Sequence, residues 1–345
     1  MTTRRHHADE QEIEPWLRSL PKAELHLHLE GTVAAPTLRK LSLRHDESPL
    51  TLAQSRSAYQ YTDFPSFLQS FKAVTQRMQT PADYQLVAWE MAQALAAQGV
   101  RHAEVYVSFG IIYYWKKEEV EPYLEAIERA RLRAERELGL SILWLADAVR
   151  HFGVADAARV FRKAAELRAQ FPAIAGIGIG GDEARGPASL FRELYAQARE
   201  YGLRLTAHAG ESVGPESIWS ALTIGAERIG HALSAQHDPE LLELLAERQI
   251  PLELCPTSNI RTGCCPSFDD HPLRRYFDAG LMVTLNSDDP PMFSSDLLGE
   301  YLLAHQQFAF TREQLRELAA NSVEASFLAP DRKLQLLADI ERYPA

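Results

Sequence analysis

The chain has 345 residues, of which 46% are hydrophobic and 24% are charged, and its formal net charge is −11. These values are ordinary for a soluble globular protein with a large core, and they exclude a disordered chain. Because the acidic excess offers no basic surface to a phosphate backbone, we do not expect nucleic acid as a partner.

We expect no export signal at the start of the chain. Residues 1–14 are polar, and no run of about 18 apolar residues that could span a membrane occurs anywhere. The cysteines Cys255, Cys264 and Cys265 are odd in number and clustered, which favours a reducing compartment. We predict a cytoplasmic protein with a disordered tail over residues 1–15 and one domain over residues 16–345. No feature indicates an oligomeric state.

Short apolar or β-branched runs recur along the chain and predict strands. They lie at residues 23–29, 100–108, 141–148, 173–179, 203–208, 227–231, 250–255 and 281–286. Amphipathic patterns between them predict helices at residues 120–138, 154–170, 187–201, 239–248 and 272–279. Eight repeated strand–helix units predict an α/β fold, the TIM (β/α)8 barrel.

The interval between the first two predicted strands is too long for one connecting helix. About seventy residues separate Glu30 from Val100, which predicts a helical insertion after the first strand. Within it, Phe64, Phe67, Leu68 and Phe71 have helical spacing and could either pack on the barrel or form a lid over a substrate site. Extra helices are predicted near the C-terminus, at residues 295–308 and 312–327.

Polar side chains collect at the ends of the predicted strands. Enzymes with this barrel place their sites at the rim where the carboxyl ends of the strands meet. His26 and His28 are two residues apart, so both imidazoles lie on one face of the first strand. Later strands contribute His208, Glu211, His231, Asp288 and Asp289.

Three histidines with Asp288 match the ligands that zinc prefers, and a catalytic zinc site keeps a position open for water. Zinc lowers the pKa of that water towards about 7, which generates hydroxide at neutral pH. Attack of hydroxide on C6 of a purine moves charge onto the adjacent ring nitrogen, where a protonated carboxyl group would help. Glu211 is our candidate for that acid. Each histidine alone is weak evidence, but their joint position at one rim favours a site.

The motifs at these positions resemble the adenosine deaminase family over nearly the whole chain, from Leu20 to about Phe327. They are Pro-Lys-Ala-Glu-Leu-His-Leu-His-Leu-Glu-Gly at residues 21–31, Gly-Asp-Glu at 181–183, Thr-Ala-His-Ala-Gly-Glu at 206–211, Arg-Ile-Gly-His at 228–231 and Thr-Leu-Asn-Ser-Asp-Asp-Pro at 284–290. The resemblance implies an aminohydrolase that replaces the exocyclic amine of a 6-aminopurine with oxygen.

The resemblance also implies roles for single residues. One Zn²⁺ per chain would be held by His26, His28, His208 and Asp288. Glu211 would protonate the purine ring nitrogen, and His231 would orient or deprotonate the attacking water.

Contacts to a small-molecule aminopurine substrate are implied as well. Asp289 would hydrogen-bond the five-membered-ring side of the purine, and the backbone of Gly181 would contact the six-membered ring. Residues 66–71 resemble the family's hydrophobic gate, which favours the lid interpretation of Phe67, Leu68 and Phe71.

Glu30 departs from the family pattern, because many adenosine-specific members carry aspartate at this position, which faces the sugar. The longer side chain would change the space around the ribose 5′ end. Glu30 is compatible with branches that act on free adenine and with branches that act on 5′-modified nucleosides, such as aminodeoxyfutalosine in menaquinone synthesis. Residues 255–259 with Thr262 and Gly263 resemble the nucleoside version of their loop.

The leading hypothesis is therefore deamination of adenosine or a 5′-modified adenosine. An adenine deaminase is the alternative enzyme, and a metal-binding barrel that acts only by interaction is the alternative of another class. The glycine-rich residues 176–180 indicate either room for a larger substituent or close packing.

Overall fold

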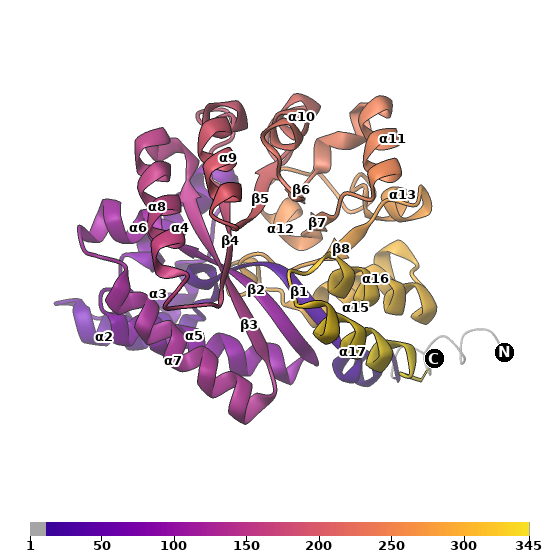
Figure 1. Ribbon diagram of the computed structural model, residues 1–345. Helices are drawn as coiled ribbons and strands as arrows, with labels where there is room; N and C mark the ends of the chain where they lie inside the picture. Colours follow the sequence, from indigo (N-terminus) through magenta and orange to yellow (C-terminus); the bar gives the residue numbers. More distant parts are fainter. Residues whose placement is uncertain (1–11, 345) are drawn as a thin grey trace.

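The computed structural model describes residues 12–344 and confirms the predicted TIM barrel. Parallel strands hydrogen-bond in sequence order from β1 to β8 (Figure 1). They are β1 (Lys22–His28), β2 (Val100–Ser108), β3 (Ser141–Val149), β4 (Ile174–Gly180), β5 (Arg204–Ala209), β6 (Arg228–His231), β7 (Leu252–Leu254) and β8 (Val283–Leu285). A backbone bridge between Leu27 and Asp288 brings the end of β8 to β1, so the barrel is nearly closed.

Helices between the strands cover the outside of the barrel (Figure 1). The longer ones are α7 (Glu121–Leu138), α8 (Val154–Leu167), α9 (Arg192–Glu200), α10 (Pro215–Ile224) and α11 (Pro239–Arg248), and the short ones include α6 (Phe109–Ile111), α12 (Pro256–Arg261) and α13 (Leu273–Asp278). Each helix that the sequence predicts in this part of the chain is present. The apolar stripes of these helices pack on the strands, which are almost wholly buried.

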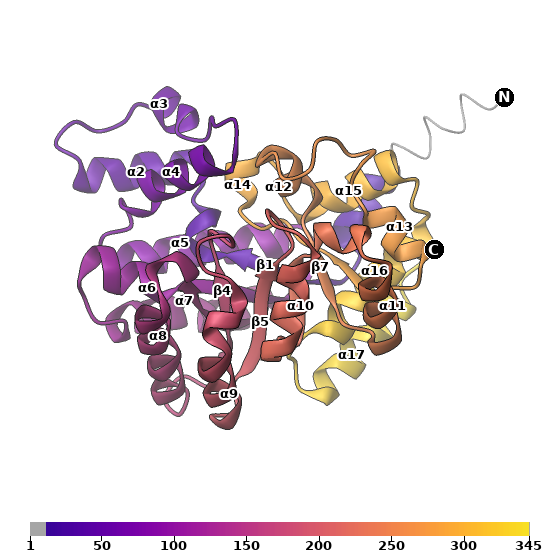
Figure 2. The same cartoon turned by 90° about the horizontal axis from the view of Figure 1, so that it is seen from above.

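The predicted insertion between β1 and β2 consists of α2 (Ala35–His45), α3 (Leu52–Ser57), α4 (Phe64–Thr75) and α5 (Pro81–Ala97). Figure 2 shows α2, α3 and α4 together at one end of the barrel, on the side of α12 and α14 (Pro290–Phe293). A capping box between Asp63 and Ser66 starts α4. Phe67 of α4 packs against Phe293 of α14, with ring centroids 5.1 Å apart. The insertion therefore lies against the loop that follows β8.

The chain ends in α15 (Leu297–Phe308), α16 (Arg312–Ala325) and α17 (Pro330–Glu341). The first two confirm the predicted C-terminal helices, whereas α17 was not predicted. The hydroxyl of Ser322 in α16 accepts a hydrogen bond of 3.2 Å from the backbone N–H of Ala23 in β1. The C-terminal helices thus pack on the first strand.

The predicted tail requires a correction where it overlaps the described residues. Residues 12–19 are helical, and Ile13 is buried, because the apolar Ile13 and Leu17 pack into the core. Residues 1–11 of that prediction lie outside the described part. The assignment of residues 16–345 to one domain stays a prediction. Among the described helices, none combines the length and apolarity needed to cross a bilayer.

The barrel interior contains a chain of buried charges. Glu253 accepts from Nδ1 of His26 at 2.8 Å and pairs with Nε of Arg228 at 2.6 Å. Arg228 also pairs with Glu104 at 2.5 Å, and its guanidinium lies over the ring of Phe327, 3.9 Å from the centroid. Burial opposes ionisation of Glu104, but Arg228 lowers the pKa of Glu104 to about 2. Glu104 and Glu253 are therefore carboxylates that depend on one guanidinium.

Replacing Arg228 with methionine should lower the free energy of unfolding by about 3–5 kcal/mol, because two buried carboxylates lose their partner. Denaturant unfolding of the metal-free protein measures this. Arg136 is a matched control, since it is 70% exposed and pairs with Glu137, and its replacement should cost less than about 1 kcal/mol. Equal small losses in both variants would show that the buried chain does not stabilise the barrel.

Candidate metal centre and substrate cavity

The predicted metal ligands converge at the carboxyl ends of the strands. Nε2 of His28 lies 3.1 Å from Nε2 of His208 and 3.4 Å from Oδ1 of Asp288, and Nε2 of His26 lies 3.5 Å from the same oxygen. Donors placed about 2.0–2.1 Å from a tetrahedral zinc ion are about 3.3–3.4 Å apart. The spacing of these four side chains fits one ion of that size.

His231 faces the same point. Ligand atoms of His26, His208, His231 and Asp288 all lie within 4.8 Å of one another. Position alone therefore offers four imidazoles and one carboxylate, which is one ligand more than the set predicted from the sequence.

The hydrogen bonds made by the Nδ1 atoms distinguish His231 from His26 and His208. Nδ1 of His26 donates to Glu253, and Nδ1 of His208 donates to the carbonyl of Ile179 at 3.0 Å. Both rings therefore turn Nε2 towards the centre. Burial opposes the charged form of His26, but Asp288 and Glu253 raise its pKa to about 10, so a metal ion would displace the second proton of that ring. Burial lowers the pKa of His28 to about 3 and places that of His208 well below its usual value, so these rings are neutral and able to ligate.

A chain of hydrogen bonds gives His231 the opposite tautomer. The N–H of Leu273 donates to Nδ1 of His271, whose Nε2 must then donate to Oδ1 of Asn259 at 3.2 Å. The amide nitrogen of Asn259 donates to Nδ1 of His231 at 3.0 Å. Burial lowers the pKa of His231 to about 4, so the ring is neutral and carries its single proton on Nε2. His231 therefore presents an N–H to the centre, which favours a hydrogen-bond donor over a ligand at this position.

The backbone is strained where the site is built. His231 has φ 65° and Asp288 has φ 64°, which are left-handed values that residues other than glycine rarely adopt. Gly31 permits a further close approach, because a Cβ there would lie 1.6 Å from Oδ1 of Asp289. The glycine of the first motif is thus needed to seat Asp289.

Glu211 is positioned by Glu183. The carboxylate of Glu183 accepts from the backbone N–H groups of Gly210, Glu211 and Ser212 at 2.8–3.0 Å and from the hydroxyl of Ser217 at 2.5 Å. Burial, with the nearby charges of Asp288 and Glu183, raises the pKa of Glu211 well above its usual value. These surroundings favour the protonated form of Glu211. The thiol of Cys264 lies 3.8 Å from Oε1 of Glu211.

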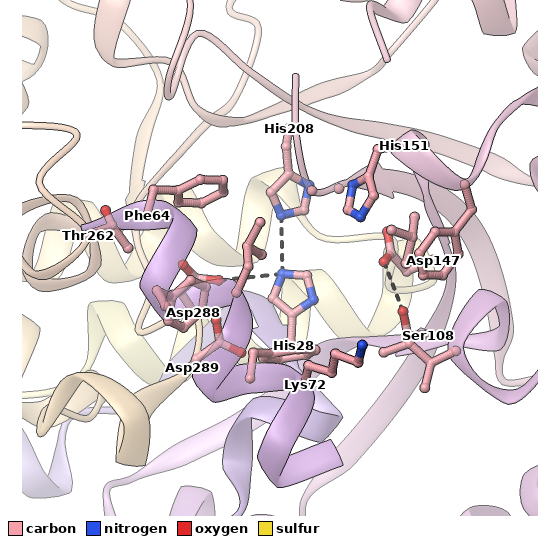
Figure 3. A pocket seen from close by; sticks show the side chains of 18 of the residues that line it. His28, Phe64, Lys72, Ser108, Asp147, His151, His208, Thr262, Asp288 and Asp289 are labelled. Atoms are coloured by element: carbon pink, nitrogen blue, oxygen red, sulfur yellow. Dashed lines mark hydrogen bonds and ion pairs between the residues drawn. The ribbon is translucent and has the colours of Figure 1, made fainter. Parts of the chain in front are cut away.

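A cavity of about 380 Å³ opens onto this group of side chains (Figure 3). Among the predicted site residues, its walls include His28, Phe67, Leu68, Phe71, Gly181, His208, Glu211, His231, Asp288 and Asp289. Phe67, Leu68 and Phe71 of α4 pack against the core and also line the cavity, and their role as a lid stays a prediction. The predicted ligand His26 is wholly buried and does not line the cavity.

Glu30 does not line the cavity. The strand ends at His28, and Leu29–Thr32 form a 3₁₀ turn, so the alternation of β1 does not continue to Glu30. Oε1 of Glu30 accepts from the N–H of Ser108 at 3.0 Å, and Ser108 forms the wall in front of it. Burial raises the pKa of Glu30 to about 7.

Several lining residues were not predicted from the sequence: Lys72, Ser108, Tyr114, Trp115, Asp147, His151 and Phe152. Ser108 and Asp147 stand at the ends of β2 and β3, so the strand-end rule could have found them. The others lie on helices and loops without a recognisable pattern. In the glycine-rich β4, a Cβ at Gly176 would meet the backbone of Arg204 at 2.4 Å and one at Gly178 would meet Tyr106 at 2.6 Å, which favours close packing over room for substrate.

The chain is similar to known proteins of the adenosine deaminase family. A family model described as adenosine deaminase matches residues 21–343. The aminodeoxyfutalosine deaminase of Streptomyces avermitilis is 39% identical over 339 residues, which cover 97% of this chain and 94% of that protein. The crystal structure of an adenine deaminase from Arthrobacter aurescens superposes with a TM-score of 0.88 at 33% identity, covering 94% of this chain and 98% of that one. A zinc-bound amidohydrolase from Burkholderia ambifaria superposes with a TM-score of 0.86 at 26% identity, covering 95% and 91%.

Replacing Asp288 with alanine should abolish tight metal binding and activity, because it removes the carboxylate that faces His26 and His28. Metal content after dialysis, measured by atomic emission, tests this. Asp289→Asn is the matched control at the adjacent position and should retain one metal ion per chain. A full metal equivalent in Asp288→Ala would reject Asp288 as a ligand.

Proposed function

The chain belongs to the adenosine deaminase family, and we propose that it deaminates a 6-aminopurine nucleoside, either adenosine or a 5′-modified adenosine such as aminodeoxyfutalosine. At the coarser level it is an aminohydrolase that acts on aminopurines, as its relatives are. The observation that carries the proposal is that three of the proposed ligands, His28, His208 and Asp288, share the wall of one cavity with Glu211, whose pKa is raised.

The proposed ligands are His26, His28, His208 and Asp288, which together fit a zinc ion in donor type and spacing. When bound, zinc supplies Lewis acidity that lowers the pKa of a water molecule towards about 7. Ser258 donates to Oδ2 of Asp288 at 2.7 Å and so leaves Oδ1 for the ion. The second contacts of His26 and His208 keep their Nε2 lone pairs directed at the same place.

The remaining side chains would handle the substrate. Glu211, being protonated, would donate its proton to the purine ring nitrogen beside C6 as that nitrogen gains charge. Nε2–H of His231 would donate to the attacking water and orient it. Burial and Asp288 raise the pKa of Asp289 well above its usual value, so its carboxyl group would donate to the five-membered ring.

The cavity also supports a nucleoside over a free base. Besides proposed metal ligands, its walls include Ser108, Asp147, Gly181 and a group of aromatic side chains. Ser108 and Asp147 are hydrogen-bonded to each other at 3.3 Å and offer polar groups to a sugar. Glu30 would act indirectly, by accepting a hydrogen bond from the backbone N–H of Ser108 and so fixing its position. Phe67, Leu68 and Phe71 would close over the substrate and exclude water.

An adenine deaminase is the second candidate, because relatives and a solved structure bear that name. The two are separated by kcat/KM, followed by ultraviolet absorbance, for adenosine, aminodeoxyfutalosine, 5′-methylthioadenosine and adenine with one zinc-loaded preparation. We expect kcat/KM for the best nucleoside to exceed that for adenine by about 100-fold or more. With adenine, which has no sugar, the polar groups of Ser108 and Asp147 would remain unpaired. Turnover of adenine without turnover of any nucleoside would replace the proposal by the second candidate.

Replacing Glu211 with glutamine should leave the metal content unchanged and lower kcat by about 10²–10⁴-fold, because the side chain keeps its shape but loses the acidic proton. Steady-state kinetics on the best substrate, together with metal analysis of the same sample, measures both effects. Near-normal kcat would transfer the acid role to another residue, and loss of metal would show that Glu211 supports the ligands instead.

A further inference from the structure

Glu211 lines two cavities. Besides the substrate cavity, a second cavity of about 590 Å³ lies among the segments that follow β5, β6 and α12. Ser234, Cys264 and Cys265 are among its lining residues. Of the residues that the structure describes, Glu211 alone lines both cavities. The predicted acid therefore has neighbours that do not line the substrate cavity.

The two carboxyl oxygens of Glu211 have different surroundings. Oε2 lies 3.7 Å from Nε2 of His231, which lines the substrate cavity, and this distance is too long for a hydrogen bond. Oε1 accepts a hydrogen bond from the thiol of Cys264, with 3.8 Å between sulfur and oxygen. Cys264 lines the second cavity and not the first. Within residues 12–344, it makes the only side-chain hydrogen bond to this carboxyl group.

Cys264 stays in the thiol form, which is the form that can donate. Burial raises the pKa of the Cys264 thiol, and the nearby Glu211 raises it further. Cys264 is a free cysteine, so its sulfur keeps a proton that it can share with an acceptor. These surroundings favour a hydrogen-bond donor over a reactive thiolate.

We propose that Cys264 positions the acidic proton of Glu211 on Oε2, the oxygen on the side of His231 and the substrate cavity. In a protonated carboxyl group one oxygen carries the proton and the other is the better acceptor. A donor at Oε1 therefore favours the form with the proton on Oε2. This inference rests on the proposed function, in which Glu211 protonates the purine ring nitrogen. Because Cys264 does not line the substrate cavity, it is a positioning residue.

The same hydrogen bond would assist the proton transfer. In that step the O–H bond at Oε2 of Glu211 breaks, an N–H bond forms on the purine ring, and Glu211 is left as a carboxylate. Cys264 keeps its own proton and then donates to a charged acceptor. Hydrogen bonds to charged groups are stronger than those to neutral groups. The contact would thus be stronger after the transfer than before it, which favours the transfer.

The test separates the donor at position 264 from the volume of the side chain. Cys264→Ser keeps a donor in a smaller side chain, whereas Cys264→Val fills the space without a donor. Both are assayed as zinc-loaded full chains on the best aminopurine substrate of the unmodified protein. We expect Cys264→Val to lower kcat by about fivefold, which is the usual worth of one hydrogen bond, with unchanged KM and metal content. Cys264→Ser should keep kcat near that of the unmodified protein.

Cys265 provides the matched control. It also lines the second cavity, but its thiol donates to the carbonyl of Ser267 at 3.3 Å and not to Glu211. Cys265→Val should therefore leave kcat unchanged. Normal kcat in Cys264→Val would overturn the inference. Equal falls in Cys264→Val and Cys264→Ser, or a fall in the serine variant alone, would show that packing matters and not the donor, and would overturn it as well.

Infrared spectra of the metal-free protein test the contact without any assay of activity. The S–H stretching band of a donating thiol lies at lower frequency than that of a free thiol. We expect the band that is lost in Cys264→Ser to move to higher frequency in Glu211→Leu, while the band of Cys265 stays in place. An unmoved band would overturn the inference alone. Lack of activity on every aminopurine in the unmodified protein would instead refute the proposed function, whatever the spectra show.

Discussion

The hydrogen bond between Glu253 and His26 connects the barrel interior to the predicted metal centre. Glu253 is fully buried, so it stays ionised only because Arg228 and His26 surround it. In return it holds the proton of His26 on Nδ1, which turns Nε2 towards Asp288. Arg228 also pairs with Glu104, so the ionised state of Glu104 depends on the same guanidinium group. A single buried carboxylate thus links the stability of the core to the direction of a ligand.

The predicted metal ligands and the aromatic walls of the cavity are built from different parts of the fold. His26, His28, His208 and Asp288 belong to strands or follow them directly, where backbone hydrogen bonds limit movement. The aromatic side chains that line the cavity belong to α4 and to the segments that follow β2 and β3. Substitutions among these aromatic residues can change what the cavity accepts without disturbing the ligands. Relatives that carry the names of different deaminases are consistent with this division.

The sequence was sufficient for the barrel and for the converging ligands, because both follow from local rules. Alternating strands and helices define the order of the sheet, and side chains at strand ends meet at one rim. Glu30, which we expected to face the sugar, does not line the cavity, for a local reason. The strand ends at His28, so the alternation of side chains does not extend to Glu30. The tautomer of His231 could not be predicted, because it depends on Asn259 and His271, which only tertiary packing brings into line. Lys72 and Trp115 meet across forty residues without any shared motif.

The closure of the barrel sets the order in which the protein can mature. The N–H of His28 donates to the carbonyl of Asp288 at 3.0 Å, and the N–H groups of Leu25 and His26 donate to the side chain of Asn286. The first strand, although synthesised first, therefore waits for the last strand before its histidines are fixed in place. A growing chain on the ribosome cannot assemble the complete ligand set until residue 288 has emerged. A metal ion at the predicted site would accordingly be acquired late, after nearly the whole chain has been made.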